Sequence, residues 1–78
     1  MTAAFTVTEG FWVYLYTPLI DWAGYDPSLQ YLQIHFHNGT EITYSGVNQG
    51  LAQGLINAKD PDLYYNNAIK NSFPTVSA

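Results

Sequence analysis

The stretch that decides the fold is LQYLQIHFHNGTEITY, residues 29–44. Apolar and polar side chains alternate along its first half, which predicts a strand with one buried face. The pair Asn38-Gly39 that follows is a strong signal for a hairpin turn. A second run of β-forming residues then ends at Tyr44, as expected of a returning strand. The stretch therefore predicts an antiparallel β-hairpin at the centre of the fold.

The register of this hairpin follows from the length of its loop. A two-residue loop would place Phe36 opposite Glu41 and mix core with solvent on one face. A three-residue loop over residues 37–39, with Gly39 in a left-handed bulge, gives one apolar face and one polar face. The cross-strand pairs expected in that register are Leu32 with Tyr44, Ile34 with Ile42, Gln33 with Thr43 and His35 with Glu41.

Three shorter runs of β-forming residues precede the hairpin. Thr6–Thr8 and Phe11–Tyr16 flank Glu9-Gly10, which predicts a further hairpin. Both faces of the second run are apolar or aromatic, as expected of a strand covered on both sides. A short strand over Ile20–Tyr25 follows, closed by the turn signal Asp26-Pro27-Ser28.

The last third of the chain predicts two short helices. The first begins at Asn48 or Gln49 and ends at Asn57. The motif Asp60-Pro61-Asp62 starts the second, with an aspartate as N-cap and the proline at the first helical position. This helix is expected to end before Pro74, and the side chains expected to face inward at four-residue steps are Tyr65, Ile69 and Phe73.

Helices this short must pack on the sheet to be stable. The fold class is therefore α+β: a small antiparallel sheet, made of the N-terminal strands plus the central hairpin, packed by two short C-terminal helices. Gly50 and Gly54 in the first helix either let another backbone or a ligand approach closely or simply weaken that helix. The sequence leaves these two interpretations open.

Length and composition limit what the chain can be. Its 78 residues suit one domain, 1–78, in which residues 1–19 form an N-terminal strand or hairpin extension. Cysteine is absent, charged residues make up 10%, and the net charge is −4. The basic residues, Lys59 and Lys70, are too few to neutralise the phosphates of DNA or RNA, so nonspecific nucleic-acid binding is not expected.

A membrane location is not expected either. The best apolar run, Phe11–Ile20, is too short for a membrane span and contains Pro18. No basic residue precedes Lys59, which argues against a secretory signal. We therefore expect a cytoplasmic protein. Its charge-poor surface is expected to be covered by self-association or by a binding face.

Residues spread through the chain carry a resemblance to a known family. They are Gly24-Tyr25-Asp26, Leu32, Ile34, Phe36, Gly39, Ile42, Tyr44, Val47, Leu55, Ala58, Tyr64-Tyr65-Asn66, Ile69-Lys70 and Phe73-Pro74. On these residues the chain from 20 to about 76 resembles the KTSC domain, named from the C-terminus of some lysyl-tRNA synthetases and found also as small stand-alone bacterial and phage proteins. The sequence departs from the family pattern at Asn48, where Pro is usual, at Asp60 and Asp62, where Ser and Gly are usual, and at Lys70, where Arg is usual. The resemblance implies a fold rather than an activity.

Two groups of polar residues suggest chemistry. His35 and His37, two apart on a strand with Glu41 opposite, have a spacing that can hold a metal, but a solvated cross-strand pair is the favoured interpretation. Asp21 and Asp26 could form an acid–base pair, but turn capping is favoured for them. With no nucleophile or phosphate-loop motif in the sequence, we expect neither an enzyme nor a bound metal or cofactor.

The aromatic residues are the most informative functional feature. Five of them exceed what a small core can absorb: Trp12, Tyr14, Tyr16, Trp22 and Tyr31. Such rings either stack on nucleobases or form an interface between copies of the chain, and the interface is favoured for Trp12 and Tyr14. The two lysines, among several asparagines, can reach a phosphate. The candidate ligand-binding residues are Trp12, Tyr14, Trp22, Tyr25, Lys59, Asn66 and Lys70.

The sequence thus predicts a non-catalytic, homo-oligomeric binder of a small nucleotide-like molecule. In a viral setting it would act as an anti-defence sponge that sequesters a host immune signal. The alternative is a protein-binding inhibitor or adaptor that covers a host protein with an acidic, aromatic-rich surface. A third hypothesis, a small nucleotide hydrolase, would require Asp21, Asp26 and the two histidines to converge.

Overall fold

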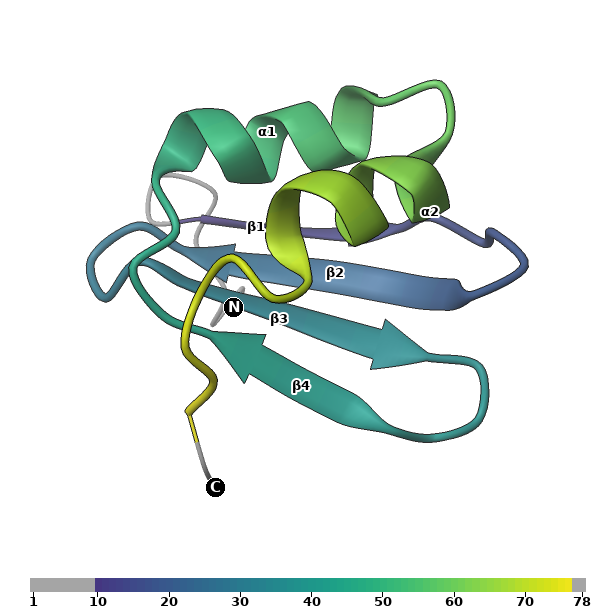
Figure 1. Cartoon of the computed structure of the whole chain (residues 1–78), viewed down its shortest axis with the longest axis horizontal. Helices are drawn as coiled ribbons and strands as arrows, with labels where there is room; N and C mark the ends of the chain where they lie inside the picture. The colour runs from purple at the N-terminus through teal and green to yellow at the C-terminus, as the bar shows by residue number, and fades with distance from the viewer. Residues whose placement is uncertain (1–9, 77–78) are drawn as a thin grey trace, which may run out of the picture.

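A computed structural model describes residues 10–76. Four strands form one antiparallel sheet in the order β1-β2-β3-β4, and the helices lie together on one side of it (Figure 1). The strands are β1 (Phe11–Tyr14), β2 (Ile20–Asp26), β3 (Tyr31–Phe36) and β4 (Glu41–Tyr44). The helices are α1 (Gln49–Asn57), α2 (Pro61–Tyr64) and the π-helix η1 (Tyr65–Ile69). This is the small α+β fold that the sequence predicts.

The central hairpin has the expected register. The pairs are Leu32 with Tyr44, Gln33 with Thr43, Ile34 with Ile42 and His35 with Glu41. The Phe36 amide donates to the Thr40 carbonyl, which closes a three-residue loop. Gly39 has φ +90°, in the left-handed region where a residue without a Cβ fits best. Alternation of side chains and loop chemistry together determined this part of the fold.

The structure of strand β1 differs from one expectation. It ends at Tyr14 and pairs with β2, with Val13 opposite Ala23. Its outward side chains Trp12 and Tyr14 are 52% and 60% exposed, so the prediction of a strand covered on both sides is wrong. The physical reason is that the helices cover only one face of the sheet (Figure 1). The expected hairpin with residues 6–8 lies outside the described residues.

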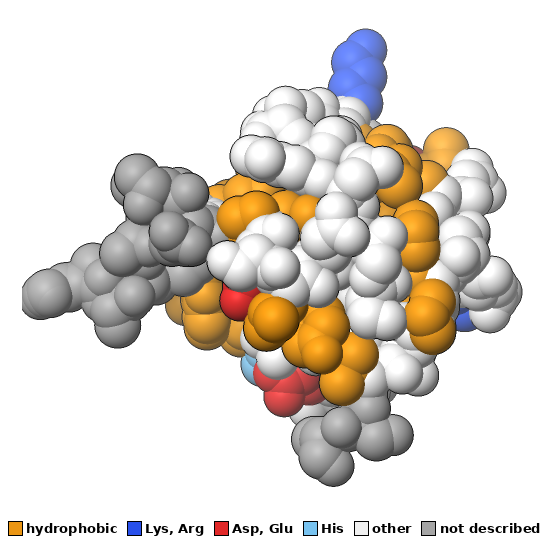
Figure 2. Space-filling model, turned by 90° about the vertical axis from the view of Figure 1, so that its left-hand side faces the viewer, with side chains coloured by type: hydrophobic (Ala, Val, Ile, Leu, Met, Phe, Trp, Pro, Cys, Tyr) orange, Lys and Arg blue, Asp and Glu red, His pale blue; other side chains and the backbone are white. Residues whose placement is uncertain are grey.

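The core lies between the sheet and the helices. Its fully buried side chains of largest volume are Ile20, Leu32, Ile34, Leu55, Ile69 and Val47. The hydroxyl groups that enter this layer all have partners: Tyr25 donates to the Val47 carbonyl at 2.6 Å, and the Tyr44 and Tyr65 hydroxyls lie 2.5 Å apart. Hydrophobic side chains also remain visible in patches on the surface seen in Figure 2, among few charged ones.

Both helix starts match the sequence. The Asn48 side chain accepts from the Leu51 amide at 2.9 Å, and the Asp60 side chain accepts from the Leu63 amide at 3.2 Å. Pro61 occupies the first turn of α2. These caps satisfy amide groups that a helix start leaves without partners.

The second helix differs from its expected form after its first turn. The Lys70 amide donates to the Tyr65 carbonyl five residues back, at 2.8 Å, so the chain winds as a π-helix and ends at Ile69. Tyr65 and Ile69 are buried as expected, but Phe73 lies outside the helix and packs against the core only in part. The predicted four-residue spacing through Phe73 is therefore wrong, because the helix ends at Ile69 and the backbone at Lys70 is already extended.

One contact joins the two helices, and another joins α2 to the β1–β2 connection. A Cβ at Gly54 would collide with the Tyr64 ring, so this glycine leaves room for Tyr64, whose hydroxyl donates to the Leu51 carbonyl at 3.0 Å. The close approach at Gly54 is thus made by the chain itself. In α2, Asp62 accepts from the Thr17 hydroxyl at 2.5 Å and from the Leu19 amide at 3.2 Å, which ties the β1–β2 connection to the helix.

Candidate functional site

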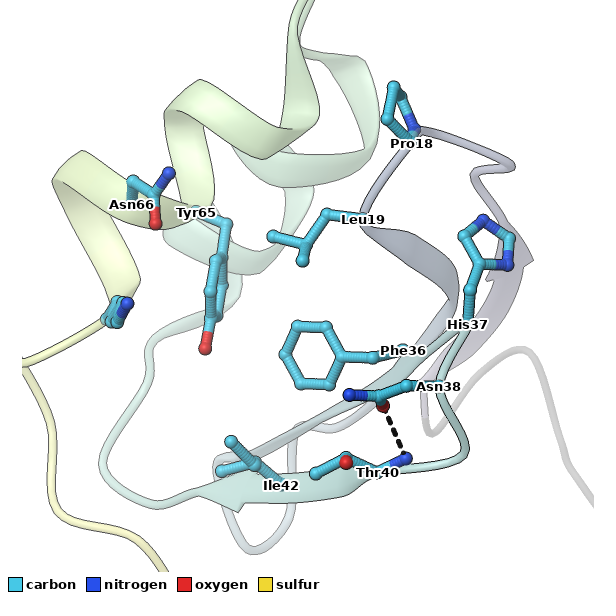
Figure 3. A pocket seen from close by; sticks show the side chains of 10 residues that line it. Pro18, Leu19, Phe36, His37, Asn38, Thr40, Ile42, Tyr65 and Asn66 are labelled. Carbon is cyan, nitrogen blue, oxygen red and sulfur yellow. Dashed lines mark hydrogen bonds between the residues drawn. The ribbon is translucent and has the colours of Figure 1, made fainter.

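A pocket of about 420 Å³ lies between η1, the β1–β2 connection and the β3–β4 turn (Figure 3). Its apolar side is formed by Leu19, Phe36 and Ile42, which come from three different segments. The Tyr65 ring adds a wall, packed edge-on against Phe36 at 5.6 Å between ring centroids. An apolar lining with a few polar groups at its edge is the usual make-up of a small-molecule site.

The wall residue Tyr65 is held firmly. Its side chain is buried, and its hydroxyl shares a hydrogen bond with the Tyr44 hydroxyl. Burial, and then this hydrogen bond, raises the pKa of Tyr65 well above its ordinary value, so the phenol stays neutral. The ring is therefore a fixed and uncharged support behind Phe36, with 3% of the residue exposed.

The π-helical turn supplies the polar residues on the helix side. Asn66 and Lys70 both line the pocket and are exposed, whereas Tyr65 and Ile69 on the same turn are buried. Single π-helical turns of this kind are often found at functional sites. The local backbone thus brings an amide and an ammonium group to one side of the cavity.

The hairpin turn supplies the polar residues opposite. The Asn38 side-chain oxygen accepts from the Thr40 amide at 2.9 Å, and its amide nitrogen points toward the middle of the pocket (Figure 3). His37 Nε2 lies 2.6 Å from the Thr17 carbonyl oxygen and so donates to it. His37 Nδ1 lies 4.0 Å from Asp21 Oδ1. These contacts hold the imidazole at the edge of the pocket.

The two lysines do not share a site. Lys70 lines the pocket, and Lys59 lies exposed on the connection between α1 and α2. Lysine side chains accordingly lie at two separate places in Figure 2, at the top and at the right-hand edge. The pocket therefore has one ammonium group, and the described chain has no basic patch.

A second group of side chains lies on the face of the sheet that the helices leave open. Trp12 stacks on Trp22 at 3.9 Å between ring centroids, and Trp22 stacks on His35 at 3.4 Å. His35 Nε2 lies 2.5 Å from Glu41 Oε2 on the next strand. We call this row of four residues across the four strands the aromatic ladder. Because Trp22 has a ring on each side, neither of its faces is open to a base.

Gly24 explains how the ladder fits on the sheet. A Cβ at this position would lie 3.3 Å from the Trp22 ring and 3.5 Å from Trp12 Nε1. The glycine, opposite Trp12 in the register, leaves room for both indoles to lie across the backbone. A nearby pair, Tyr14 and Tyr16, is 60% and 70% exposed with nearly parallel rings 5.2 Å apart.

Of the seven candidate ligand-binding residues, only Asn66 and Lys70 line the pocket, whereas Trp12 and Trp22 meet on the open face of the sheet. Tyr25 lies in the core with its hydroxyl bonded to Val47, and the other candidates lie on the open face or, for Lys59, on the helix connection. The other eight residues that line the pocket were not among the candidates for the ligand site: Pro18, Leu19, Phe36, His37, Asn38, Thr40, Ile42 and Tyr65. They come from three parts of the chain that are far apart in the sequence, and no sequence pattern indicates that these parts meet.

The residues considered for metal or acid–base chemistry do not form one site either. His35 faces Glu41 on the open face, as the cross-strand interpretation predicts, while His37 turns toward Thr17. Asp26 caps its own turn by accepting from the Ser28 amide at 2.9 Å. Within residues 10–76 no group of three or more His, Asp or Glu side chains could hold a metal ion. No helix in that range is long and apolar enough to cross a bilayer.

Comparisons with known proteins agree with this geometry. The model of the KTSC domain family matches residues 18–73. A solved structure of a KTSC domain protein from Yersinia pestis has a TM-score of 0.81 at 23% identity, covering 88% of this chain and 97% of that one. That likeness shows a shared fold. No curated protein sequence matches the chain.

Proposed function

The chain belongs to the KTSC domain family, and from that premise we propose that it is a non-catalytic domain that binds one small nucleotide-like molecule. The ligand site is the pocket between η1 and the β3–β4 turn. The observation that carries the proposal is the combination, in one cavity, of an apolar side with amide groups and a single ammonium group at its edge. Nucleotides combine the same features: a flat base, a hydroxylated sugar and a phosphate.

Each part of a nucleotide has a counterpart in the pocket. A base can pack against Phe36, which is partly exposed and is held in place by the buried Tyr65 ring behind it. The side-chain amides of Asn38 and Asn66 can donate to and accept from base edges or ribose hydroxyls. Lys70 provides a charge-assisted hydrogen bond for phosphate.

The contacts of the pocket support binding rather than turnover. His37, the residue best suited to acid–base chemistry, donates from Nε2 to a backbone carbonyl and faces Asp21 with its other nitrogen. No serine or cysteine lies beside it in the pocket lining as a nucleophile. We therefore propose stoichiometric retention of the ligand. In a viral protein, the same retention would withdraw a nucleotide signal from the host.

The two lysines provide the test, since they offer a matched pair of variants. Lys70→Gln removes the charge in the pocket, and Lys59→Gln makes the same change in net charge outside it. Binding of a panel of nucleotides and cyclic nucleotides would be measured by titration calorimetry and native mass spectrometry. We expect the wild type and Lys59→Gln to bind equally and Lys70→Gln to bind at least about tenfold more weakly. A wild type that binds none of the panel, or two variants that bind alike, would refute the proposal.

A second candidate function is self-association through the open face of the sheet. Trp12, Tyr14 and Tyr16 are more than half exposed there, and Tyr and Trp are enriched at protein interfaces. Glu41 Oε2 already lies 2.5 Å from His35 Nε2, so this carboxylate has a partner within the chain when a second copy covers it. This candidate agrees with the expected homo-oligomer.

Sedimentation over a range of concentrations tests self-association. Tyr14→Lys places a charge on the open face, and Gln53→Lys, on the exposed side of α1, is the control. We expect a dimer that Tyr14→Lys dissociates and Gln53→Lys leaves intact. A wild type that stays monomeric would refute self-association and favour the protein-binding alternative for this face.

A further inference from the structure

We infer that the ligand of the pocket is a nucleotide with a single negative charge, as in a phosphodiester, and not a di- or triphosphate. This inference rests on the proposed function and adds the charge of the ligand to it. The observation behind it is the balance of charges in and around the pocket. Each phosphate charge that enters a protein site needs a positive or hydrogen-bonding partner to replace its water.

The first part of that balance is the supply of positive charge. Lys70 is the one lysine among the described residues that line the pocket. Lys59 lies on the α1–α2 connection and does not contribute to the lining. His37 Nε2 already donates to the Thr17 carbonyl at 2.6 Å, so this N–H is not available to a phosphate. One ammonium group can neutralise one phosphate charge.

The second part is the negative charge behind the pocket. Asp62 contacts the Leu19 amide at 3.2 Å, and Leu19 lines the cavity. Asp21 lies beside His37 on the hairpin side. A chain of phosphates that extended from Lys70 across the cavity would approach these carboxylates, in a protein whose net charge is −4. Each further phosphate would therefore meet repulsion without a new partner.

The remaining polar groups favour a ligand that is mostly uncharged. Asn38, Asn66 and the Thr40 hydroxyl are neutral donors and acceptors, suited to base edges and sugar hydroxyls. The volume of about 420 Å³ lies in the lower part of the range for small-molecule sites, which favours one nucleoside unit over two. A cyclic mononucleotide combines one nucleoside unit with one phosphodiester charge.

The test is a series of ligands that share a nucleoside and differ in charge. Adenosine, 3′,5′-cyclic AMP, AMP, ADP and ATP, and the matching guanosine series, would be titrated into the full chain by calorimetry at constant ionic strength without magnesium. We expect the cyclic nucleotide to bind most tightly and the triphosphate to bind at least about tenfold more weakly. Affinity that rises with the number of phosphates, and that Lys70→Gln abolishes, would overturn this inference and leave the proposed function standing. No binding by any member would refute the proposed function itself.

A pair of aspartate variants tests whether a carboxylate beside the pocket causes the weaker binding of ATP. Asp21→Asn removes the carboxylate beside the pocket, and Asp26→Asn makes the same change in net charge at the β2–β3 turn, where an asparagine can still cap. We expect Asp21→Asn to reduce the ratio of the affinities for cyclic AMP and ATP by about threefold or more. Asp26→Asn should leave that ratio nearly unchanged. Equal effects of the two variants would show that overall charge, and not the pocket, sets the order and would overturn the inference.

Discussion

Both faces of the sheet carry large apolar or aromatic side chains, yet these side chains have opposite surroundings. On the face under the helices, Leu32 and Ile34 are completely buried. On the open face, Trp12 and Tyr14 are more than half exposed although their side chains are larger. In the hairpin the alternation of apolar and polar residues already marks the face that becomes the core. In β1 both faces are apolar or aromatic, and the buried one is the face that the helices cover (Figure 1).

The open face is nevertheless ordered by its own contacts. The aromatic ladder runs across all four strands, and each ring packs on its neighbour instead of on another layer. Stacked rings of this kind add about 0.5–1.5 kcal/mol per pair beyond the area that they bury. The covered face is therefore expected to provide most of the stability, and the open face a smaller share.

The largest effect should come from a truncation in the core. Ile34→Ala removes a fully buried side chain and should lower the free energy of unfolding by about 2–5 kcal/mol. Its neighbour Gln33 points to the open face, so Gln33→Ala is the matched control and should cost less than about 1 kcal/mol. Urea unfolding followed by circular dichroism measures both. Similar losses from the two variants would contradict the contrast between the faces.

Alkaline pH should destabilise the protein through two tyrosines that are buried in the core. Burial raises the pKa of Tyr25 and of Tyr65 above the ordinary value, with the Asp26 charge adding to the shift at Tyr25 and the Tyr44 hydroxyl to that at Tyr65. Above about pH 10 the unfolded chain releases these protons and the folded chain retains them, so stability falls as pH rises.

Tyrosinate absorbance and circular dichroism, followed together as pH rises, measure this loss. We expect part of the tyrosine absorbance to develop only as the fold is lost. Tyr65→Phe removes one of the two groups and should make the loss of stability with pH less steep. Ionisation of all tyrosines with the fold intact would contradict the prediction.

Loss of the middle ring of the ladder should have a smaller effect than loss of a core residue. Trp22→Ala removes both stacking contacts and should cost about 1–3 kcal/mol. The near-ultraviolet circular dichroism signal of two coupled indoles should disappear with it, since Trp12 would lose its partner. Tyr31→Ala, on the same face but outside the ladder, is the control. An unchanged indole signal in Trp22→Ala would show that the two rings do not stack in solution.

The parts of the fold that were predicted depend on local chemistry. The register around Gly39 and the caps at Asn48 and Asp60 each follow from residues close together in the sequence. The burial of Tyr25 depends instead on an irregularity in β2 between Ile20 and Trp22. This irregularity shifts which side chains of the strand point to each face of the sheet. Because of that shift, both Ile20 and Tyr25 face the core, and Tyr25 is not available to a ligand.

The pocket could be predicted only in part for a similar reason. Asn66 and Lys70 were identified by their residue types, as donors for a small ligand. Their position on one side of a cavity depends on the π-helical turn, whose five-residue hydrogen bond no periodic pattern in the sequence indicates. The His35–Glu41 part of the ladder was predicted from the hairpin, but the stacking of Trp12 and Trp22 was not, because it requires the registers of two further strand pairs.

The smallest change in the free energy of unfolding is expected for a substitution of Tyr16, which lies where the open face meets the β1–β2 connection. Tyr16 has φ +49°, a left-handed conformation that costs a residue with a Cβ about 1 kcal/mol and a glycine nothing. Tyr16→Gly removes that cost but also loses the stack on Tyr14 and adds freedom to the unfolded chain. These terms nearly cancel, so we expect a change in unfolding free energy within about 0.5 kcal/mol. Tyr14→Gly, in an extended strand where no strain is relieved, should cost more than Tyr16→Gly in the same urea titration. A clear loss of stability in Tyr16→Gly would mean that the exposed ring, and not the backbone, holds this connection in place.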